Sequence, residues 1–313
     1  MAGSKGHGGD MAIGWRSIDL RRGLFRLAVM AAGLSTSGAA ALAEDNAVTW
    51  LLPDYPPVTI SHGPRQGTGY ADIFLRYLTE QTPEYAHHRE SSSMSRVFGL
   101  MQQGQPVCHP SLLKTPEREV FVDFSGPVEF VLPHHIVVRS DRIGRFDAYR
   151  NTEGTVDVGR LMKDLGLVTT YQEKRGYPPV VSAALKASAG QKNVIETSAD
   201  DEGPFRQLAA GWVDYIIAYP DEVNWFAELL RQADTVRFEY LPIAGLAEYT
   251  IGHVGCTKGA WGKKIVERVD EIVAKAGTRP VWVDAEARLL DAAAAKRFED
   301  VFARNSPFRP RPR

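Results

Sequence analysis

The chain has 313 residues, of which 44% are hydrophobic and 24% are charged, and its formal net charge is −1. This length and composition can bury a sizeable core and form two lobes of ordinary domain size, whereas the near-neutral charge excludes the basic surface that nucleic-acid-binding proteins present. We therefore predict a globular protein without a nucleic-acid partner.

The first 43 residues are typical of a cleaved export signal. Four arginines between positions 16 and 26 precede an apolar stretch, residues 27–42, which ends in the small-x-small sequence Ala41-Leu42-Ala43. We expect cleavage near Ala43 and a mature chain that begins near Glu44, with Met11 as an alternative start of translation. No later apolar run is long enough to cross a bilayer.

Both cysteines, Cys108 and Cys256, belong to the mature part of the chain. Export to an oxidising compartment makes them candidates for a disulfide that closes a long loop. The alternative is two separately buried thiols, and the sequence leaves both open.

Apolar residues with strand-like and helix-like spacing alternate along the mature chain. Strands are predicted at 48–52, 107–108, 165–169, 194–195, 213–218, 236–241 and 249–256. Helices are predicted at 70–78, 97–101, 179–186, 205–210, 223–230, 261–276 and 284–304. Alternation of this kind predicts the α/β fold class.

A short helix is expected to begin at Thr115-Pro116-Glu117-Arg118. Threonine is a good N-cap, proline suits the first helical position, and glutamate complements the positive end of the helix dipole. Arg118 opposes that dipole at a cost of roughly 0.3 to 1 kcal/mol, but together with free backbone N–H groups it offers a place for an anion. The alternative is an ion pair with Glu117 or Glu119.

The stretch 112–128, LLKTPEREVFVDFSGPV, resembles the extracellular solute-binding proteins of the amino-acid-binding type, family 3. In that family a Thr-x-x-Arg sequence is followed by a hydrophobic stretch that closes on Asp-Phe-Ser-x-Pro. Further matches are DYPP at 54–57, GYAD at 69–72 and LAAGWVD at 208–214. The resemblance spans nearly the whole mature chain.

The resemblance implies the type II periplasmic binding fold, in which two α/β lobes are joined by two crossover strands, here near 133–139 and 239–252. The first lobe would comprise 44–136 and 241–313, and the second lobe 137–240. It also implies a periplasmic monomer that closes like a hinge on a small solute and serves an ABC-type transporter or a sensor in the membrane.

The resemblance further implies that Arg118 pairs with a carboxylate of the solute. Ser111 would add hydrogen bonds, and Tyr55 matches the aromatic side chain that stacks on the solute. The alternative for Tyr55, as for Tyr219, is a core or rim aromatic.

One departure from the family concerns the position just after a second-lobe strand, where amino-acid binders carry an acidic residue for the ligand's ammonium group. Tyr219 occupies that position here, which argues against an ordinary α-amino acid. Arg175 and Tyr177 are candidates for the second lobe's side of the cleft, and Arg96 for an additional cation, so an anionic or hydrogen-bonding solute is favoured. The alternative for Arg96 and Arg175 is a solvated surface cation.

We predict no cofactor and no metal, because the adjacent histidine pairs at 87–88 and 134–135 diverge and lack a third ligand at a sensible spacing. We also predict no enzymatic activity. The rival hypothesis is a lyase similar to cyclohexadienyl dehydratase on the same scaffold, with Glu173 or His109 as its acidic or histidine group. A third hypothesis is an interaction module with a vestigial cleft.

Overall fold

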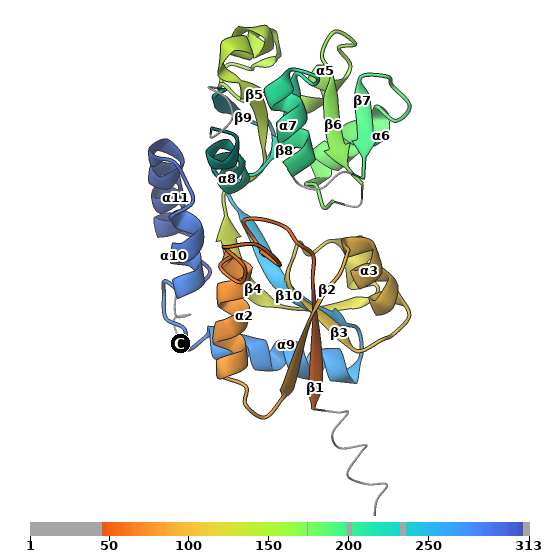
Figure 1. The fold of residues 1–313 in the computed structure, drawn as a ribbon, viewed down its shortest axis with the longest axis vertical. Coiled ribbons are helices and arrows are strands. Elements are labelled where there is room, and N and C mark those ends of the chain that lie inside the picture. The colour runs from red at the N-terminus through yellow and green to blue at the C-terminus, as the bar shows by residue number, and fades with distance from the viewer. Residues whose placement is uncertain (1–45, 174, 199–201, 232–235, 309–313) are drawn as a thin grey trace, which may run out of the picture. The chain divides into compact units, whose positions relative to one another are not determined.

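The computed structural model of the protein describes residues 46–173, 175–198, 202–231 and 236–308 (Figure 1). The predicted export signal, residues 1–43, and the predicted mature start at Glu44 lie outside the described residues. Within the described part of the chain, no helix is long and apolar enough to cross a membrane.

The first sheet has five strands in the order β2-β1-β3-β10-β4. Strand β1 pairs in parallel with β2 and β3, whereas β10 runs antiparallel to β3 and β4. The strands are β1 (Ala47–Leu52), β2 (Ala86–Ser91), β3 (Val107–Leu112), β4 (Val122–Val131) and β10 (Thr250–Thr257). The helices packed around it are α2 (Tyr70–Glu80), α3 (Met94–Gln102), α4 (Pro116–Glu119), α9 (Ala260–Val273), α10 (Val281–Ala287) and α11 (Ala292–Asn305).

Alternate residues of β1 point to opposite faces of this sheet, as strand geometry requires. Trp50 and Leu52 are buried in a core shared with α2, α9, α10 and α11, whereas Leu51 packs with α3. Figure 1 shows α2 and α3 on opposite sides of β1. The continuous apolar run of β1 therefore reflects a strand that is buried on both faces.

The second sheet also has five strands, in the order β7-β6-β8-β5-β9. In β8, Tyr215 and Ile217 face a core with α5 and α6, and Ile216 and Ala218 face a core with α7 and α8. The strands are β5 (His135–Arg139), β6 (Thr169–Gln172), β7 (Val194–Thr197), β8 (Tyr215–Ala218) and β9 (Phe238–Pro242). The helices are the 3-10 helix η1 (Ser140–Tyr149), α5 (Val158–Met162), α6 (Pro179–Ala187), α7 (Glu202–Ala210) and α8 (Pro220–Arg231).

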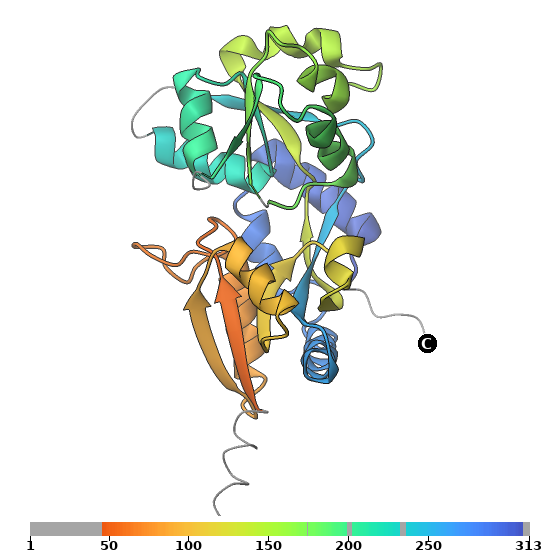
Figure 2. The same cartoon turned by 90° about the vertical axis from the view of Figure 1, so that its right-hand side faces the viewer.

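The chain passes between the two sheets twice, once after β4 and once before β10 (Figures 1 and 2). We call the first sheet with α2, α3, α4, α9, α10 and α11 the first lobe, and the second sheet with η1 and α5 to α8 the second lobe. The predicted α/β class with two lobes is confirmed.

Some elements of the structure differ from the prediction. Strand β2 was not predicted, because its sequence AHHRES has no apolar alternation and most of it is exposed at the edge of the sheet. The predicted helix 284–304 is two helices, since Asp291 caps α11 by accepting hydrogen bonds from two backbone N–H groups. The predicted strand 165–169 begins only at Thr169.

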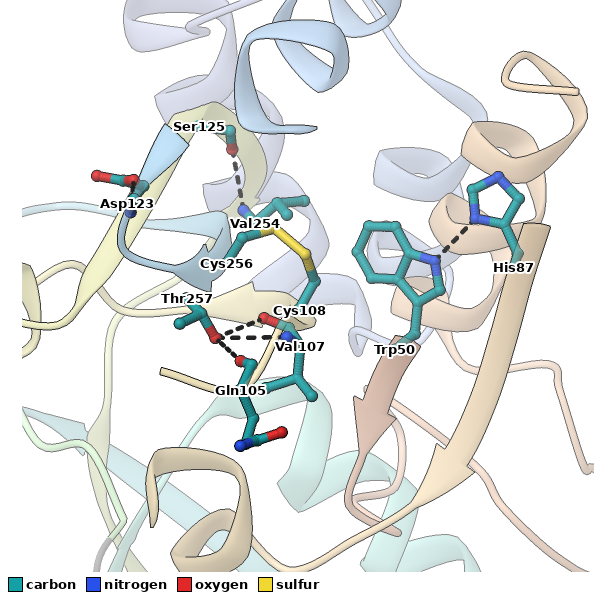
Figure 3. The surroundings of a disulfide bond; sticks show 11 residues. Trp50, His87, Gln105, Val107, Cys108, Asp123, Ser125, Val254, Cys256 and Thr257 are labelled. Carbon is teal, nitrogen blue, oxygen red and sulfur yellow. Dashed lines mark hydrogen bonds between the residues drawn. A yellow bond between two sulfur atoms is a disulfide. The ribbon is translucent and has the colours of Figure 1, made fainter. Parts of the chain in front are cut away.

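The predicted disulfide between Cys108 and Cys256 is confirmed, and Figure 3 shows its surroundings. The two residues lie directly opposite each other in the antiparallel pair of β3 and β10, with their Cα atoms 4.1 Å apart. Both side chains are fully buried in the core of the first lobe. The bond therefore fixes the returning segment of the chain to its N-terminal half.

Candidate ligand-binding cleft

A cleft of about 450 Å³ is lined by residues of both lobes. The segments that follow the parallel strands β1, β2, β3, β6, β7 and β8 contribute to its lining, together with residues of β3, β4 and β10. The crevice outside the carboxyl ends of parallel strands is the usual place for a ligand in open α/β sheets.

Arg118 reaches the cleft from α4 in the first lobe. As predicted, Thr115 caps this helix, because its hydroxyl accepts a hydrogen bond from the backbone N–H of Arg118. The half-buried Arg118 guanidinium donates one hydrogen bond to the carbonyl of Leu113 (2.9 Å) and lies 4.7 Å above the ring of Phe98. Burial lowers the pKa of Arg118.

The charge of Arg118 has no protein counter-ion among the residues that the structure describes. Neither of the two glutamates considered as its partners forms an ion pair with it, and Glu119 pairs instead with Lys114 (2.9 Å). Partial burial of a guanidinium costs free energy when no carboxylate pairs with it, and a bound anion would offset that cost. The lining of the cleft therefore includes a half-buried cation without a carboxylate partner among the described residues.

Arg175 reaches the cleft from the second lobe, but its charge is compensated inside the protein. Its guanidinium donates to both carboxylate oxygens of Glu222, at 2.9 and 2.7 Å, and to Gln172 (2.8 Å). Only 11% of the Arg175 side chain and 1% of the Glu222 side chain are exposed. The rings of Tyr55 and Tyr219 lie 5.2 and 5.7 Å from this guanidinium. Arg175 thus holds the aromatic wall of the cleft in place.

A polar cluster of His109, Ser111 and Glu129 lines the cleft in the first lobe. The backbone N–H of Ser111 donates to Nδ1 of His109 (3.0 Å), and the Ser111 hydroxyl donates to Oε2 of Glu129 (2.6 Å). Burial lowers the pKa of His109 to about 3, and the nearby Arg118 adds to this effect. Burial raises the pKa of Glu129 to about 8, with the Ser111 bond opposing the shift and Asp221 adding to it.

Further buried acids surround Tyr70 next to this cluster. Burial raises the pKa of Asp221, at the start of α8, to about 7, and the charge of Glu222 adds to the shift. Burial also raises the pKa of Glu286, on α10, and Asp221 and Glu129 reinforce the effect. Burial and the mutual repulsion of these carboxyl groups therefore favour their protonated, uncharged forms.

Replacement of Glu129 by glutamine is expected to stabilise the protein increasingly as the pH rises from 4.5 to 8. The pKa of Glu129 rises from 4.5 to about 8 on folding, so its contribution to stability is fully present below pH 4.5 and is lost as the pH rises to 8. Glutamine cannot ionise, so relative to the wild type the variant should gain on the order of 4 kcal/mol between pH 4.5 and pH 8. Melting temperatures at pH 4.5 and pH 8 measure this.

The matched control for that experiment is Glu267→Gln, because the Glu267 side chain on α9 is 63% exposed. Its effect on the melting temperature should be the same at both pH values. A Glu129→Gln effect that is equally independent of pH would contradict a protonated Glu129 in the folded protein.

The structure brings most of the predicted binding residues to one cleft. Tyr55, Ser111, Arg118, Arg175 and Tyr219 all line it.

The two other predicted residues do not line the cleft. Tyr177 packs behind it, where its hydroxyl oxygen accepts a hydrogen bond from the backbone N–H of Gln172 (3.2 Å) and its ring lies 5.5 Å from that of His134. Arg96 is on α3, and the residues of this segment that line the cleft are Ser93, Met94 and Ser95.

Sequence reasoning missed Glu129. Its signal was a single acidic residue between Val128 and Phe130 in the apolar second half of β4, and all three side chains are buried. An isolated buried acid on a strand that ends at a cleft is a candidate functional group.

No protein-family model matches the chain, and no curated protein matches its sequence. Solved structures do match. A histidine kinase sensor domain, described as similar to periplasmic binding proteins, has a TM-score of 0.58 at 17% identity and covers 78% of this chain and 96% of its own.

A structure from work on glutathione import through GshT and the cystine ABC importer of Streptococcus mutans has a TM-score of 0.58 at 15% identity and covers 82% of this chain and 95% of its own. The P235GK mutant of ArgBP from T. maritima has a TM-score of 0.57 at 12% identity, with 80% and 97% covered. At these identities the likeness shows the fold, and the chain has the two-lobe fold of the periplasmic binding proteins.

Proposed function

We propose that the protein is an exported, periplasmic solute-binding protein that captures a small carboxylate-bearing molecule in the cleft between its lobes. The observation that carries this proposal is Arg118, a half-buried cation of the cleft lining without a carboxylate partner among the described residues. A guanidinium can bind a carboxylate through two parallel, charge-assisted hydrogen bonds. The solute's carboxylate would thereby supply the missing counter-charge.

Binding would favour closure of the lobes, because each lobe contributes to the same small site. Gly176 of the second lobe lies so close to Arg118 that an added Cβ would be 3.0 Å from the guanidinium Nη2. A carboxylate on Arg118 would therefore also lie near the second lobe. A ligand that contacts both lobes binds the closed state more tightly than the open one and shifts the population towards it.

The partners that we propose are a membrane transporter or a membrane sensor, served by a monomeric binding protein. Support comes from the neighbouring structures, one of which concerns an ABC importer and another a histidine kinase sensor domain. These names describe those proteins, and for this chain the partner is an inference from the shared fold.

The test is a thermal-shift measurement of the purified protein with a panel of small carboxylates, run in parallel on Arg118→Met. A ligand at a hundredfold excess over its Kd should stabilise the wild type by about 2.7 kcal/mol. Loss of the charge-assisted pair should weaken binding by about tenfold to a hundredfold in Arg118→Met.

Arg96→Met is the matched control, because Arg96 lies on α3 beside the cleft but not in its lining. It should bind the same carboxylates as the wild type. Equal binding by Arg118→Met and the wild type would show that the carboxylate site lies elsewhere.

A lyase similar to cyclohexadienyl dehydratase is the second candidate, and Glu129 favours it. A buried carboxyl with a pKa of about 8 in a cleft that also holds Arg118 could donate a proton to a leaving hydroxyl of a bound acid. His109 is less suited to that role, because its pKa of about 3 leaves it without the extra proton at neutral pH. Consumption of a bound hydroxy acid, followed by NMR and abolished in Glu129→Gln, would establish this activity in place of simple binding.

A further inference from the structure

The cleft has a second polar feature besides Arg118. Nε2 of His109 and Oε1 of Glu129 are both buried without a hydrogen-bond partner. Their residues are only 4% and 5% exposed, and both line the cleft. Buried polar atoms are nearly always hydrogen-bonded, so two orphaned atoms at one cleft point to a ligand group that pairs with them.

Ser111 fixes the chemistry that these two atoms offer. Because Nδ1 of His109 accepts the backbone N–H of Ser111, the neutral ring carries its proton on Nε2 and presents an N–H donor. Because Oε2 of Glu129 accepts the Ser111 hydroxyl, Oε1 is the oxygen left for another partner. Ser111 is therefore a positioning residue, in addition to its predicted place in the cleft lining.

The surroundings keep both groups uncharged at neutral pH. His109 is buried and faces the cation of Arg118, which opposes a second positive charge. Burial opposes the ionisation of Glu129, and the nearby Asp221 adds to this effect. The groups that face Glu129 are Tyr70 on α2, Ser111 on β3, Tyr219 after β8, Asp221 on α8 and Glu286 on α10.

We propose that His109, Ser111 and Glu129 form an uncharged subsite, which selects carboxylates that carry a hydroxyl or amide group over those that carry an ammonium group. This inference rests on the proposed function, since it assumes that Arg118 holds the carboxylate. A hydroxyl oxygen or an amide carbonyl can accept hydrogen bonds both from the His109 N–H and from the protonated Oε1 of Glu129, so it pairs with both orphaned atoms.

An ammonium group fits this subsite poorly. It has no acceptor for the His109 N–H, and it would meet a neutral carboxyl group where it needs an ionised one. The carboxylate of Glu222 on the opposite lobe is already paired with Arg175. A methyl group would leave both polar atoms unsatisfied, which weakens binding by about tenfold or more.

The first experiment examines the subsite without a ligand. In ¹⁵N and ¹³C NMR spectra of the wild type, His109 should remain the neutral Nε2–H tautomer from pH 5 to pH 8, and Glu129 should be protonated at pH 7. Spectra of His109→Gln and Glu129→Gln assign the signals. An imidazolium at pH 6, or an ionised Glu129 at pH 7, would overturn the proposal.

The second experiment compares matched carboxylates of three to six carbons that differ only in their end group. For the four-carbon chain the probes are 4-hydroxybutyrate, succinamate and 4-aminobutyrate, together with pentanoate, in which a methyl group stands in place of the hydroxyl. The hydroxyl or amide member should bind at least about tenfold more tightly than the ammonium and methyl members. Comparison of the hydroxyl and amide compounds shows which of the two groups fits the subsite better.

Two variants test whether the subsite causes this preference. Glu129→Leu should abolish the preference while retaining the binding of pentanoate through Arg118, and Ser111→Ala should reduce it. If 4-aminobutyrate binds most tightly, or if the preference survives in Glu129→Leu, the proposed subsite is contradicted. The proposed carboxylate site at Arg118 would not be affected by either result. If no compound of the series binds, the proposed carboxylate site is contradicted. The NMR measurement would still decide whether the subsite is uncharged.

Discussion

Replacement of both Cys108 and Cys256 by alanine is expected to lower the free energy of unfolding by up to about 5 kcal/mol. The two residues are 148 positions apart, so their bond closes a long loop. In the chain-entropy model a loop of this length removes a large part of the conformational freedom of the unfolded chain, which raises the stability of the folded state by about 5 kcal/mol. The loss of two buried sulfur atoms from the core of the first lobe acts in the same direction.

Chemical denaturation of the oxidised wild type and of the double alanine variant measures this effect. The control is the same denaturation in the presence of a reducing agent. It should lower the free energy of unfolding of the wild type and leave that of the variant unchanged. A variant whose unfolding midpoint coincides with that of the oxidised wild type would refute a stabilising role for the bond. The double variant is used because a single substitution would leave a free, reactive thiol.

Replacement of Arg175 by methionine is expected to destabilise the protein by about 3 to 5 kcal/mol. Glu222 has only 1% of its side chain exposed, so removal of its partner leaves an uncompensated buried charge. Besides Arg175, its Oε2 accepts only the backbone N–H of Tyr219 (2.7 Å) in the described structure. The change should also loosen Tyr55 and Tyr219, whose rings pack around the Arg175 guanidinium.

The double variant Arg175→Met/Glu222→Gln tests the cause. If the unpaired charge is responsible, the double variant should be more stable than Arg175→Met alone, since no buried charge remains. The control is Arg304→Met, which removes an exposed ion pair with Glu248 and should cost at most about 1 kcal/mol. A loss in Arg175→Met no larger than in this control would show that the buried pair adds little.

Several features of the protein could be predicted from the sequence because they depend on residues that are close together in the chain. The α/β class followed from the spacing of apolar residues, since that spacing records which side chains face a core. The N-cap at Thr115 followed from residue types within one turn of a helix. The break between α10 and α11 was missed, although Asp291 is a good N-cap, because the alanine-rich stretch around it favours one continuous helix.

The resemblance placed Arg118, Ser111 and Tyr55, and all three line the cleft. Arg96, chosen as a cation beside Ser93 and Ser95 at the start of a helix, lies outside the lining. Strand β2 could not be recognised, because it is held by pairing with β1 and by the bond from the Trp50 indole N–H to His87 (3.0 Å).

The sequence by itself therefore determined the local elements of this protein, the chemistry available to a disulfide, and the presence of an arginine at a helix start. Only the tertiary structure decided which charges remain uncompensated. Glu222 pairs with Arg175 across 47 positions, and Ser111 joins Glu129 across 18. The spacing of hydrophobic residues reflects which face of a single element is buried. The protonation state of a polar group, and which of its atoms lack a hydrogen-bond partner, depend instead on contacts between elements that are distant in the chain.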